Sequence, residues 1–236
     1  MAIIPWFYEQ ATKGFRNEPA RKIKDALRPV KHAIVGKRGL YQAIDMVKER
    51  AKNKGTEVRV VFDVGAAIGE AALPLAKAFP VAQIYCFEPL PESYALLVER
   101  TRNFRNRVHC FNYGLHERPG ELKFYVNEDH HDASSLIPPP ESWKRHEISI
   151  PVKRLDDVCR ELGITHIDFM KVDVEGMEKE ALGGAREILC HTDSAFVEIS
   201  PWRKGYNHDY IDVFESLYAA GLAFVGVYDD YFFTRQ

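Results

Sequence analysis

The alternation of strand-forming and helix-forming segments constrains this fold more than any other feature of the sequence. From residue 56 onward, short runs rich in β-branched and aromatic residues are separated by segments in which apolar residues recur at helical spacing. The runs expected to form strands are 58–62, 84–87, 108–111, 167–172, 195–199, 222–227 and 231–234. The segments expected to form helices are 70–79, 91–103, 155–162, 176–190 and 209–220. Strands joined through helices run parallel, so the pattern predicts an α/β fold with a mostly parallel sheet and helices on both faces.

Two further segments have a different character. Residues 121–126 and 148–152 alternate apolar and polar side chains, which is typical of antiparallel strands with one buried face. The stretch between them contains adjacent histidines, adjacent serines and three consecutive prolines, so we expect it to be a loop. These segments together predict a β-hairpin inserted into the α/β domain.

The beginning of the chain is predicted to be a basic helical extension. Nine lysines and arginines lie within residues 13–38, opposed by two acidic residues. Apolar residues recur at helical spacing in 23–34 and again in 40–51, so we divide the chain into an extension, 1–55, and a main domain, 56–236. We expect the basic face to be solvated, with peripheral contact to an acidic membrane or a phosphorylated substrate as the alternative.

Composition argues against several classes of protein. The chain has 236 residues with 32 basic and 34 acidic side chains, and its net charge of −2 argues against a dedicated nucleic-acid binder. No uncharged apolar run approaches the ~20 residues that span a bilayer, so we expect no transmembrane helix. The four cysteines are scattered without a Cys-x-x-Cys pair, which predicts free thiols in a reducing, cytoplasmic setting. The sequence does not indicate an oligomeric state.

A glycine-containing turn after the first expected strand predicts a ligand-binding loop. Gly65 and Gly69, in the loop 63–69, allow unusual backbone conformations and a close approach to a ligand. Glu88 ends the second strand ~20 residues further on, where an acid accepts hydrogen bonds from both hydroxyls of an adenosine ribose. The two features indicate a nucleoside cofactor, with a simple tight turn as the alternative. Ala67 replaces the second glycine of the dinucleotide fingerprint, so NAD is the weaker candidate.

Acidic residues follow two further expected strands. Asp173 and Glu175 come directly after a buried strand, and Glu198 lies near the end of the next one. Ligands of parallel α/β sheets bind outside the carboxyl ends of the strands, so we expect these acids near Asp63 and Glu88. Capping of the following helix is the structural alternative, which accounts for one acid more easily than for both.

Several segments resemble motifs of the FkbM family of S-adenosylmethionine-dependent methyltransferases. In the family's order these segments are 62–69, 87–89, 133–136 and 167–185, and the most specific piece is 171–176 with Leu182, Gly184 and Ala185. The resemblance covers about residues 58–200, and it departs from the family at Ala66-Ala67, where Ala-Asn is usual. It implies a Rossmann-like class I methyltransferase fold with a seven-stranded sheet, an FkbM-like domain over 56–236, and O-methylation of sugar or natural-product hydroxyls.

The resemblance also implies where the cofactor, S-adenosylmethionine, binds. Its methionine moiety would be surrounded by residues of the first loop: Asp63, Gly65, Ala66, Ala67 and Gly69. Its ribose would be held by Glu88, with Pro89 also in the cofactor site, and its adenine would lie near Asn112, Tyr113 and Gly114 after the third strand. Methyl transfer is an in-line displacement, so the protein mainly positions the acceptor oxygen behind the methyl carbon.

A general base accelerates attack by an alcohol, by ~10²–10⁴-fold. Asp173 and Glu175 are candidates because of their placement, and His131 is a candidate because histidine titrates near neutral pH. His116 and His130 are further candidates.

Other groups are candidates for binding the acceptor or a metal. A divalent cation held by Asp173 and Glu198 is an alternative to base catalysis, which we do not expect. The residues expected to line the acceptor site are Ser134, Ser135, Glu198, Trp202 and Tyr206. The two aromatic rings among them would form an apolar wall for a sugar ring, with ordinary core packing as the alternative.

The sequence thus predicts an S-adenosylmethionine-dependent O-methyltransferase whose acceptor is a hydroxyl of a sugar, a glycan or a glycolipid precursor. A small-molecule or natural-product O-methyltransferase is the alternative within the same class of enzyme. An NAD-dependent oxidoreductase and a domain that binds the cofactor without chemistry are the alternatives from other classes.

Overall fold

The computed structural model describes residues 39–127, 145–199, 210–228 and 230–235 of the chain. The helical pattern predicted at 23–34 lies outside the described residues, and so does the basic face. Several predicted site residues also lie outside them: His130, His131, Ser134, Ser135, Trp202 and Tyr206.

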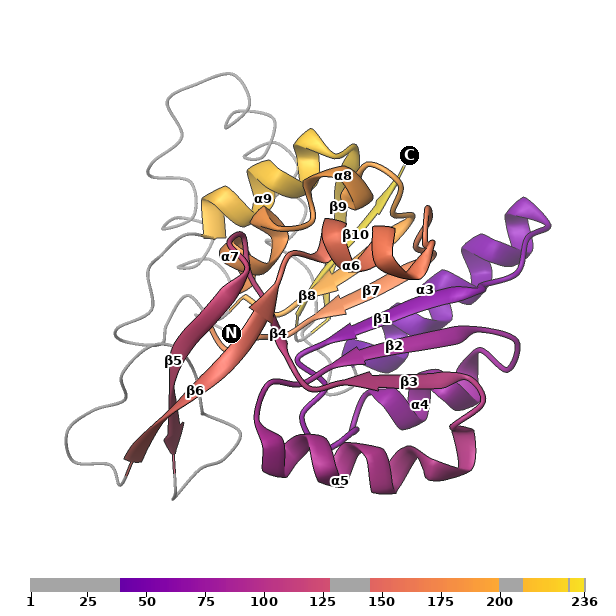
Figure 1. Cartoon of the computed structure of the whole chain (residues 1–236). Coiled ribbons are helices and arrows are strands. Elements are labelled where there is room, and N and C mark those ends of the chain that lie inside the picture. The colour runs from indigo at the N-terminus through magenta and orange to yellow at the C-terminus, as the bar shows by residue number, and fades with distance from the viewer. Residues whose placement is uncertain (1–38, 128–144, 200–209, 229, 236) are drawn as a thin grey trace, which may run out of the picture.

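The main sheet has seven strands in the order β3-β2-β1-β7-β8-β10-β9 (Figure 1). These strands are β1 (Val60–Val64), β2 (Gln83–Phe87), β3 (Val108–Phe111), β7 (Phe169–Val172), β8 (Ser194–Val197), β9 (Leu222–Tyr228) and β10 (Asp230–Arg235). Neighbours from β3 to β8 pair in parallel, and β10 runs antiparallel to both β8 and β9. This sheet confirms the predicted fold class, and β9 and β10 confirm the strands predicted at 222–227 and 231–234.

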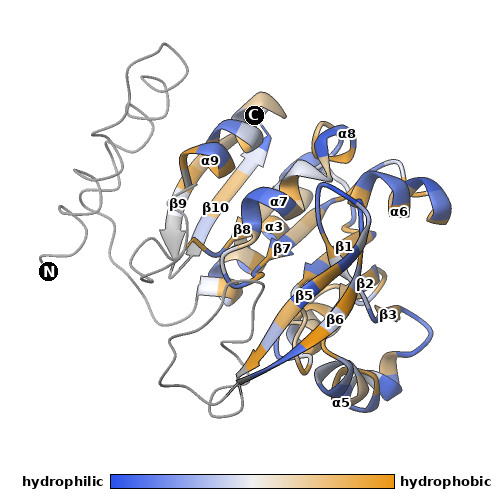
Figure 2. Cartoon of the chain, turned by 60° about the vertical axis from the view of Figure 1, so that its left-hand side comes forward, coloured by the Kyte–Doolittle hydropathy of each residue, from blue (hydrophilic) through white to orange (hydrophobic). Residues whose placement is uncertain are grey.

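Helices cover both faces of this sheet. One face carries α3 (Gly39–Lys54), α4 (Ala72–Ala78) and α5 (Pro91–Thr101). A short 3₁₀ helix, η2 (Arg102–Phe104), follows α5. The other face carries α6 (Leu155–Leu162), α7 (Glu178–Gly183), α8 (Arg186–Leu189) and α9 (Tyr210–Ala219). Side chains alternate between the faces along a strand, so Val61 packs in the first layer and Phe62 in the second. Figure 2 shows largely hydrophobic strands in the main sheet and helices that carry both hydrophilic and hydrophobic residues.

The helical pattern predicted at 40–51 is confirmed as α3. This helix buries Ala43, Ile44 and Val47 against the first layer, and it ends before Gly55, whose φ of +66° suits a helix terminus. The division of the chain at residue 55 stays a prediction. Within the described ranges, none of the helices combines the length and the apolar character of a membrane span.

Among the element boundaries that differ from the predictions, two lie next to the first turn. Strand β1 continues to Val64, so Asp63 lies inside the strand rather than in the loop that follows. Helix α4 begins at Ala72 rather than Glu70, because residues 67–71 form turns around Gly69.

The single helix predicted over 176–190 was wrong, because this segment forms two short helices. A Cβ atom at Gly184 would lie 2.4 Å from the carbonyl oxygen of His116, so the chain passes close to another backbone at the break. The buried carboxylate of Asp156 then accepts hydrogen bonds from the N–H groups of Glu187 (3.1 Å) and Ile188 (3.0 Å). These are N–H groups that the start of a helix leaves without intrahelical partners, so Asp156 favours a new helix at this point.

A second sheet of three strands stands beside the first (Figure 1). Strands β5 (Gly120–Asn127) and β6 (Arg145–Lys153) pair antiparallel as the predicted hairpin, and a short strand that was not predicted, β4 (Gly114–Leu115), pairs parallel to β6. We call the two long strands the β5–β6 ribbon. Its apolar face packs on Leu90, at the start of α5, through Phe124, Val126, Ile150 and Val152. The ribbon therefore lies near the carboxyl end of β2.

Candidate functional site

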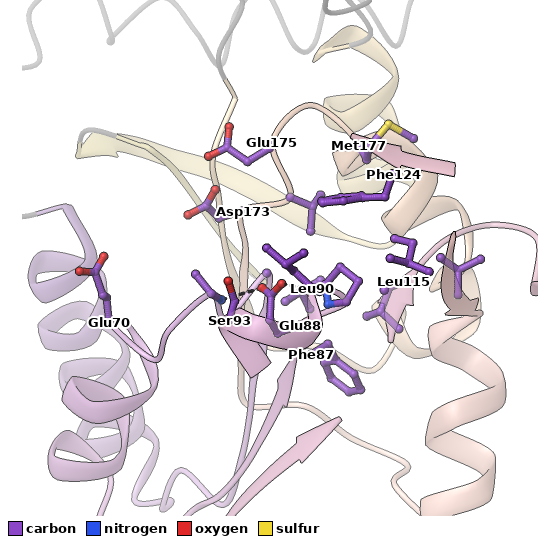
Figure 3. A pocket seen from close by; sticks show the side chains of 18 residues that line it. Glu70, Phe87, Glu88, Leu90, Ser93, Leu115, Phe124, Asp173, Glu175 and Met177 are labelled. Carbon is purple, nitrogen blue, oxygen red and sulfur yellow. Dashed lines mark hydrogen bonds between the residues drawn. The ribbon is translucent and has the colours of Figure 1, made fainter. Parts of the chain in front are cut away.

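A cavity of about 200 Å³ lies at the carboxyl ends of β1, β2 and β7 (Figure 3). This is the edge at which parallel α/β sheets bind ligands. The cavity brings together the following predicted site residues: Gly65, Ala67, Glu88, Pro89, Gly114, Asp173 and Glu175. The other described residues predicted for the cofactor, Asp63, Ala66, Gly69, Asn112 and Tyr113, are not part of this lining.

The turn after β1 is built around a close contact with the end of β7. Gly65 has a φ of +77°, and a Cβ atom there would lie 1.7 Å from the carbonyl oxygen of Asp173. The N–H groups of Gly65 and Ala66 both donate to the carbonyl oxygen of Phe87 at 3.0 Å, which ties the turn to the end of β2. Glycine at position 65 is therefore required by space as well as by backbone conformation.

The departure from the family at Ala66-Ala67 has a conformational consequence. Ala67 has a φ of +45° and is exposed. Asparagine is enriched in this left-handed region, whereas alanine pays a steric penalty there. The asparagine that is usual in the family at this position thus suits the turn better than Ala67 does.

Glu88 lies on the floor of the cavity and organises the turn above it. One carboxylate oxygen accepts a hydrogen bond from the N–H of Ala67, and the other accepts one from the N–H of Leu90, each at 2.8 Å. The side chain is buried, and this burial raises the pKa of Glu88 to about 7, although the two backbone hydrogen bonds and Lys171 oppose the rise. Each carboxylate oxygen has a second acceptor site, so Glu88 retains capacity for a diol.

Asp173 and Glu175 project from the end of β7 on the opposite wall, above Glu88 in Figure 3. Glu175 has a φ of +56°, and the buried carboxylate of Glu178 accepts hydrogen bonds from the N–H groups of Val174 (3.2 Å) and Gly176 (3.1 Å). Helix α7 begins at Glu178 after the N-cap residue Met177. Neither Asp173 nor Glu175 occupies the N-cap position, so the helix-capping interpretation of these acids was wrong.

Glu198, which follows β8, approaches the same wall. Asp173, Glu175 and Glu198 each offer a carboxylate oxygen, and these oxygens lie within 4.8 Å of one another. Three carboxylates at this spacing form an acidic mouth that suits proton uptake or a hard cation. Exposed acids gather in this way in many proteins, so the spacing alone does not identify a metal site.

Asp63 lies beneath the turn instead of in the cavity. Its carboxylate is fully buried, and its Oδ1 atom is 3.4 Å from the Nζ atom of Lys171. Burial raises the pKa of Asp63, and the neighbouring Lys171 ammonium opposes that rise. A direct contact of Asp63 with the cofactor therefore stays a prediction, whereas its contact with Lys171 is part of the structure.

The segment predicted to face adenine supports the end of β2. The side-chain amide of Asn112 donates to the carbonyl oxygens of Glu88 (2.9 Å) and Pro89 (3.1 Å). The ring of Tyr113 packs against Phe87, with a centroid separation of 5.8 Å. Asn112 thus holds Glu88 and Pro89 in place, Tyr113 packs on the preceding Phe87, and Gly114 lines the cavity itself.

The candidate base His116 lies elsewhere. Its Nδ1 atom accepts a hydrogen bond from the N–H of Arg118 at 3.1 Å, and it does not line the cavity. Its placement gives no support to a role as the base.

The sequence did not single out part of the cavity wall: Leu90, Ser93, Phe124, Ile150, Val152 and Met177. Phe124, Ile150 and Val152 belong to the apolar face of the β5–β6 ribbon. The alternation in 121–126 and 148–152 predicts that such a face exists, but it does not say what the face covers.

The fold and this cavity define a class of protein: an α/β domain that binds a nucleoside cofactor between a glycine turn and the acid after β2. The model of the methyltransferase FkbM domain matches residues 63–221. The chain therefore belongs to the FkbM methyltransferase family, as the resemblance implied.

Curated relatives have related names. The chain is 31% identical to the 2-O-methyltransferase NoeI of Sinorhizobium fredii over 154 residues, which cover 60% of this chain and 63% of NoeI. It is 27% identical to the hexuronic acid methyltransferase AglP of Haloferax volcanii, over 69% of this chain and 63% of AglP. It is 30% identical to the 31-O-demethyl-FK506 methyltransferase FkbM of Streptomyces tacrolimicus, over 56% of this chain and 63% of that protein. The matches thus span less than two thirds of these relatives.

Proposed function

We propose that this protein is an S-adenosylmethionine-dependent O-methyltransferase whose acceptor is a sugar hydroxyl, free or within a glycan or glycolipid precursor. The observation that carries the proposal is the shared cavity, where the Gly65 turn, Glu88 and Asp173 converge from three neighbouring strands. Membership of the FkbM family favours methyl transfer over the NAD-dependent oxidoreductase and over a domain without chemistry.

The residues of the cavity fit S-adenosylmethionine. The missing Cβ at Gly65 leaves backbone rather than a side chain at the turn, and the Glu88 carboxylate offers two acceptor oxygens for the ribose diol. Apolar contacts from Leu90, Phe124 and Val152 suit the face of an adenine ring. The enclosed volume of about 200 Å³ is below the ~300–1,000 Å³ of ligand pockets, so part of the ligand would extend into the mouth.

In methyl transfer, the protein mainly positions the two reactants and removes a proton from the acceptor hydroxyl. When bound, S-adenosylmethionine supplies an electrophilic methyl group whose sulfur departs as a neutral thioether with the electron pair of the broken bond. In this proposal Asp173, at the junction of the turn and the mouth, accepts the proton of the attacking hydroxyl, and Glu175 lies beside it. The candidate His131 lies outside the described residues and stays a prediction.

Two of the relatives favour carbohydrate as the acceptor class. NoeI is named a 2-O-methyltransferase and AglP a hexuronic acid methyltransferase. The FkbM relative, named for demethyl-FK506, supports a natural-product alcohol as the second candidate. The aromatic wall of Trp202 and Tyr206 and the serines Ser134 and Ser135 belong to this proposal as acceptor contacts.

Metal assistance through Asp173 and Glu198 is the second mechanism. The oxygen spacing of the acidic mouth supports it, and the ordinary tendency of surface acids to gather opposes it. Turnover that survives EDTA at its original rate excludes metal assistance. Turnover that is lost with EDTA and restored by Mg²⁺ excludes unassisted base catalysis.

The location of the protein is also a proposal. All four cysteines, Cys86, Cys110, Cys159 and Cys190, are free thiols, which suits a reducing cytoplasm. Membrane contact through the basic extension concerns residues outside the described ranges and stays a prediction.

Calorimetric titration tests the cofactor part of the proposal. We expect S-adenosylhomocysteine to bind and NAD to give no heat above dilution. Glu88→Gln should weaken S-adenosylhomocysteine by about tenfold, the effect of one hydrogen bond to a charged group. Glu92→Gln is the matched control, because Glu92 is an exposed acid in the first turn of α5. Binding of NAD alone contradicts the proposal.

An acceptor panel tests the reaction. Neutral hexosides, 6-deoxyhexosides, hexuronates and a macrolide alcohol are incubated with S-adenosylmethionine, and the released S-adenosylhomocysteine is measured. Release with a glycoside or a hexuronate supports the sugar proposal. Release with the macrolide alone favours the natural-product alternative, and release with none of them favours a binding domain.

A further inference from the structure

Lys171 is a buried cation at the centre of the site. It lies on β7 directly opposite Asp63 of β1, and only 8% of its surface is exposed. Side chains two positions apart on a strand point to the same face, so Lys171 and Asp173 share the face on which Asp63 lies. Register and alternation thus place one ammonium group between two carboxylates from different strands.

The ammonium group has three oxygen neighbours. Its Nζ atom donates a hydrogen bond to the carbonyl oxygen of Gly65 at 2.9 Å. It forms ion pairs with Asp173 Oδ2 at 3.1 Å and with Asp63 Oδ1 at 3.4 Å. A lysine ammonium has three donors, so this arrangement matches its capacity.

The ammonium form of Lys171 is favoured in this setting. Burial disfavours the ammonium form, but Asp63 and Asp173 outweigh burial and raise the pKa of Lys171 above its ordinary value. An ammonium group already paired with three oxygen atoms is unsuited to take the acceptor's proton, so the part of Lys171 in the site is to hold other groups.

We propose that Lys171 is a positioning residue that holds the Gly65 turn and the Asp173 carboxylate in one rigid frame, so that cofactor and general base keep a fixed separation. The proposal rests on the proposed function for the role of Asp173. The frame is short, because Gly65 also packs closely against the backbone carbonyl of Asp173. A displaced Lys171 would move both partners at once.

A purely structural role is the competing explanation. A buried Asp63 without a cation is destabilising, so Lys171 would then serve only to neutralise it. The two explanations make different predictions for a variant that lacks the charges of both Asp63 and Lys171. Removing Asp63 as well cancels the structural need for Lys171, but it restores neither the hydrogen bond to Gly65 nor the ion pair with Asp173.

The test compares Lys171→Met with the double variant Asp63→Asn/Lys171→Met. Lys54→Met is the matched control, because Lys54 pairs with Asp193 at 3.6 Å at the amino end of β8, away from the cavity. Thermal melting should show the single variant destabilised and the double variant recovering at least part of the loss. Titration with S-adenosylhomocysteine and turnover with the best acceptor of the panel are then measured for each folded variant.

We expect both Lys171 variants to bind S-adenosylhomocysteine about tenfold more weakly, as for one lost hydrogen bond to a charged group. We expect kcat to fall by about 10²-fold with little change in the acceptor KM, because a misplaced base slows the step without removing acceptor contacts. Recovery of either quantity in the double variant overturns the proposal, as does a Lys54→Met variant that behaves like Lys171→Met.

Failure of this proposal is distinguishable from failure of the proposed function. If the wild-type protein binds S-adenosylhomocysteine but methylates no acceptor, the binding measurement alone decides the role of Lys171 at the turn. If the wild-type protein methylates an acceptor and the double variant recovers, only the role of Lys171 is lost. If the wild-type protein does not bind S-adenosylhomocysteine, both proposals are overturned.

Discussion

The buried Glu88 makes the stability of this protein depend on pH in a way that one substitution should remove. Its pKa is raised from 4.5 to about 7, chiefly by burial. Between these pH values the folded protein holds a proton on Glu88 that the unfolded chain has released. The stabilising contribution of Glu88 protonation to the free energy of unfolding is thus fully present below pH 4.5 and is lost as the pH rises through about 7.

The size of this effect follows from the same shift. A rise of about 2.5 in pKa at ~1.4 kcal/mol for each tenfold change in proton affinity amounts to about 3 kcal/mol. Glu88→Gln removes the titration, although it also sacrifices a backbone hydrogen bond at every pH. We therefore expect the variant to gain about 3 kcal/mol relative to wild type between pH 4 and pH 8.

Urea unfolding of both proteins across this pH range measures the difference directly. The same series for Glu92→Gln, which changes an exposed acid on the neighbouring helix, is the matched control. If the free energies of unfolding of wild type and Glu88→Gln differ by the same amount at every pH, the reasoning is refuted. Glu88 would then titrate in the same way in the folded and the unfolded protein.

Three further substitutions test the turn after β1 and the start of α8. Gly65→Ala should abolish S-adenosylhomocysteine binding in calorimetry, because its Cβ would meet the Asp173 carbonyl at 1.7 Å; unchanged affinity contradicts this. Ala67→Gly should stabilise the protein by about 0.5–1 kcal/mol in urea unfolding by relieving the positive φ. The same change at the exposed Ala95 of α5 should destabilise it by a similar amount, and equal effects at the two sites contradict the assignment. Asp156→Ala should cost about 2–3 kcal/mol because two N–H groups of α8 lose their acceptor, with S-adenosylhomocysteine affinity unchanged; a loss of affinity contradicts its structural role.

The order of the elements was predictable because it depends on local patterns. Apolar runs that bury both faces identified the strands, and the small residues around Gly65 identified the turn. Glu88 was predictable as a site residue because it directly follows the apolar run that forms β2.

The features that were missed depend on contacts between distant residues. The break between α7 and α8 is set by Asp156 and by the approach of Gly184 to His116, which no local pattern records. Lys171 was visible within a motif, but its partner Asp63 lies on another strand. The wall formed by the β5–β6 ribbon was missed for the same reason, since periodicity shows which residues share a face and not what that face contacts.

A crystal structure of the complex with S-adenosylhomocysteine tests the central claim most directly. The account predicts that both ribose hydroxyls lie within hydrogen-bond distance of the Glu88 carboxylate and that the sulfur lies between the Gly65 turn and Asp173. A ribose bound away from Glu88, or a sulfur on the far side of the β5–β6 ribbon, would contradict the account.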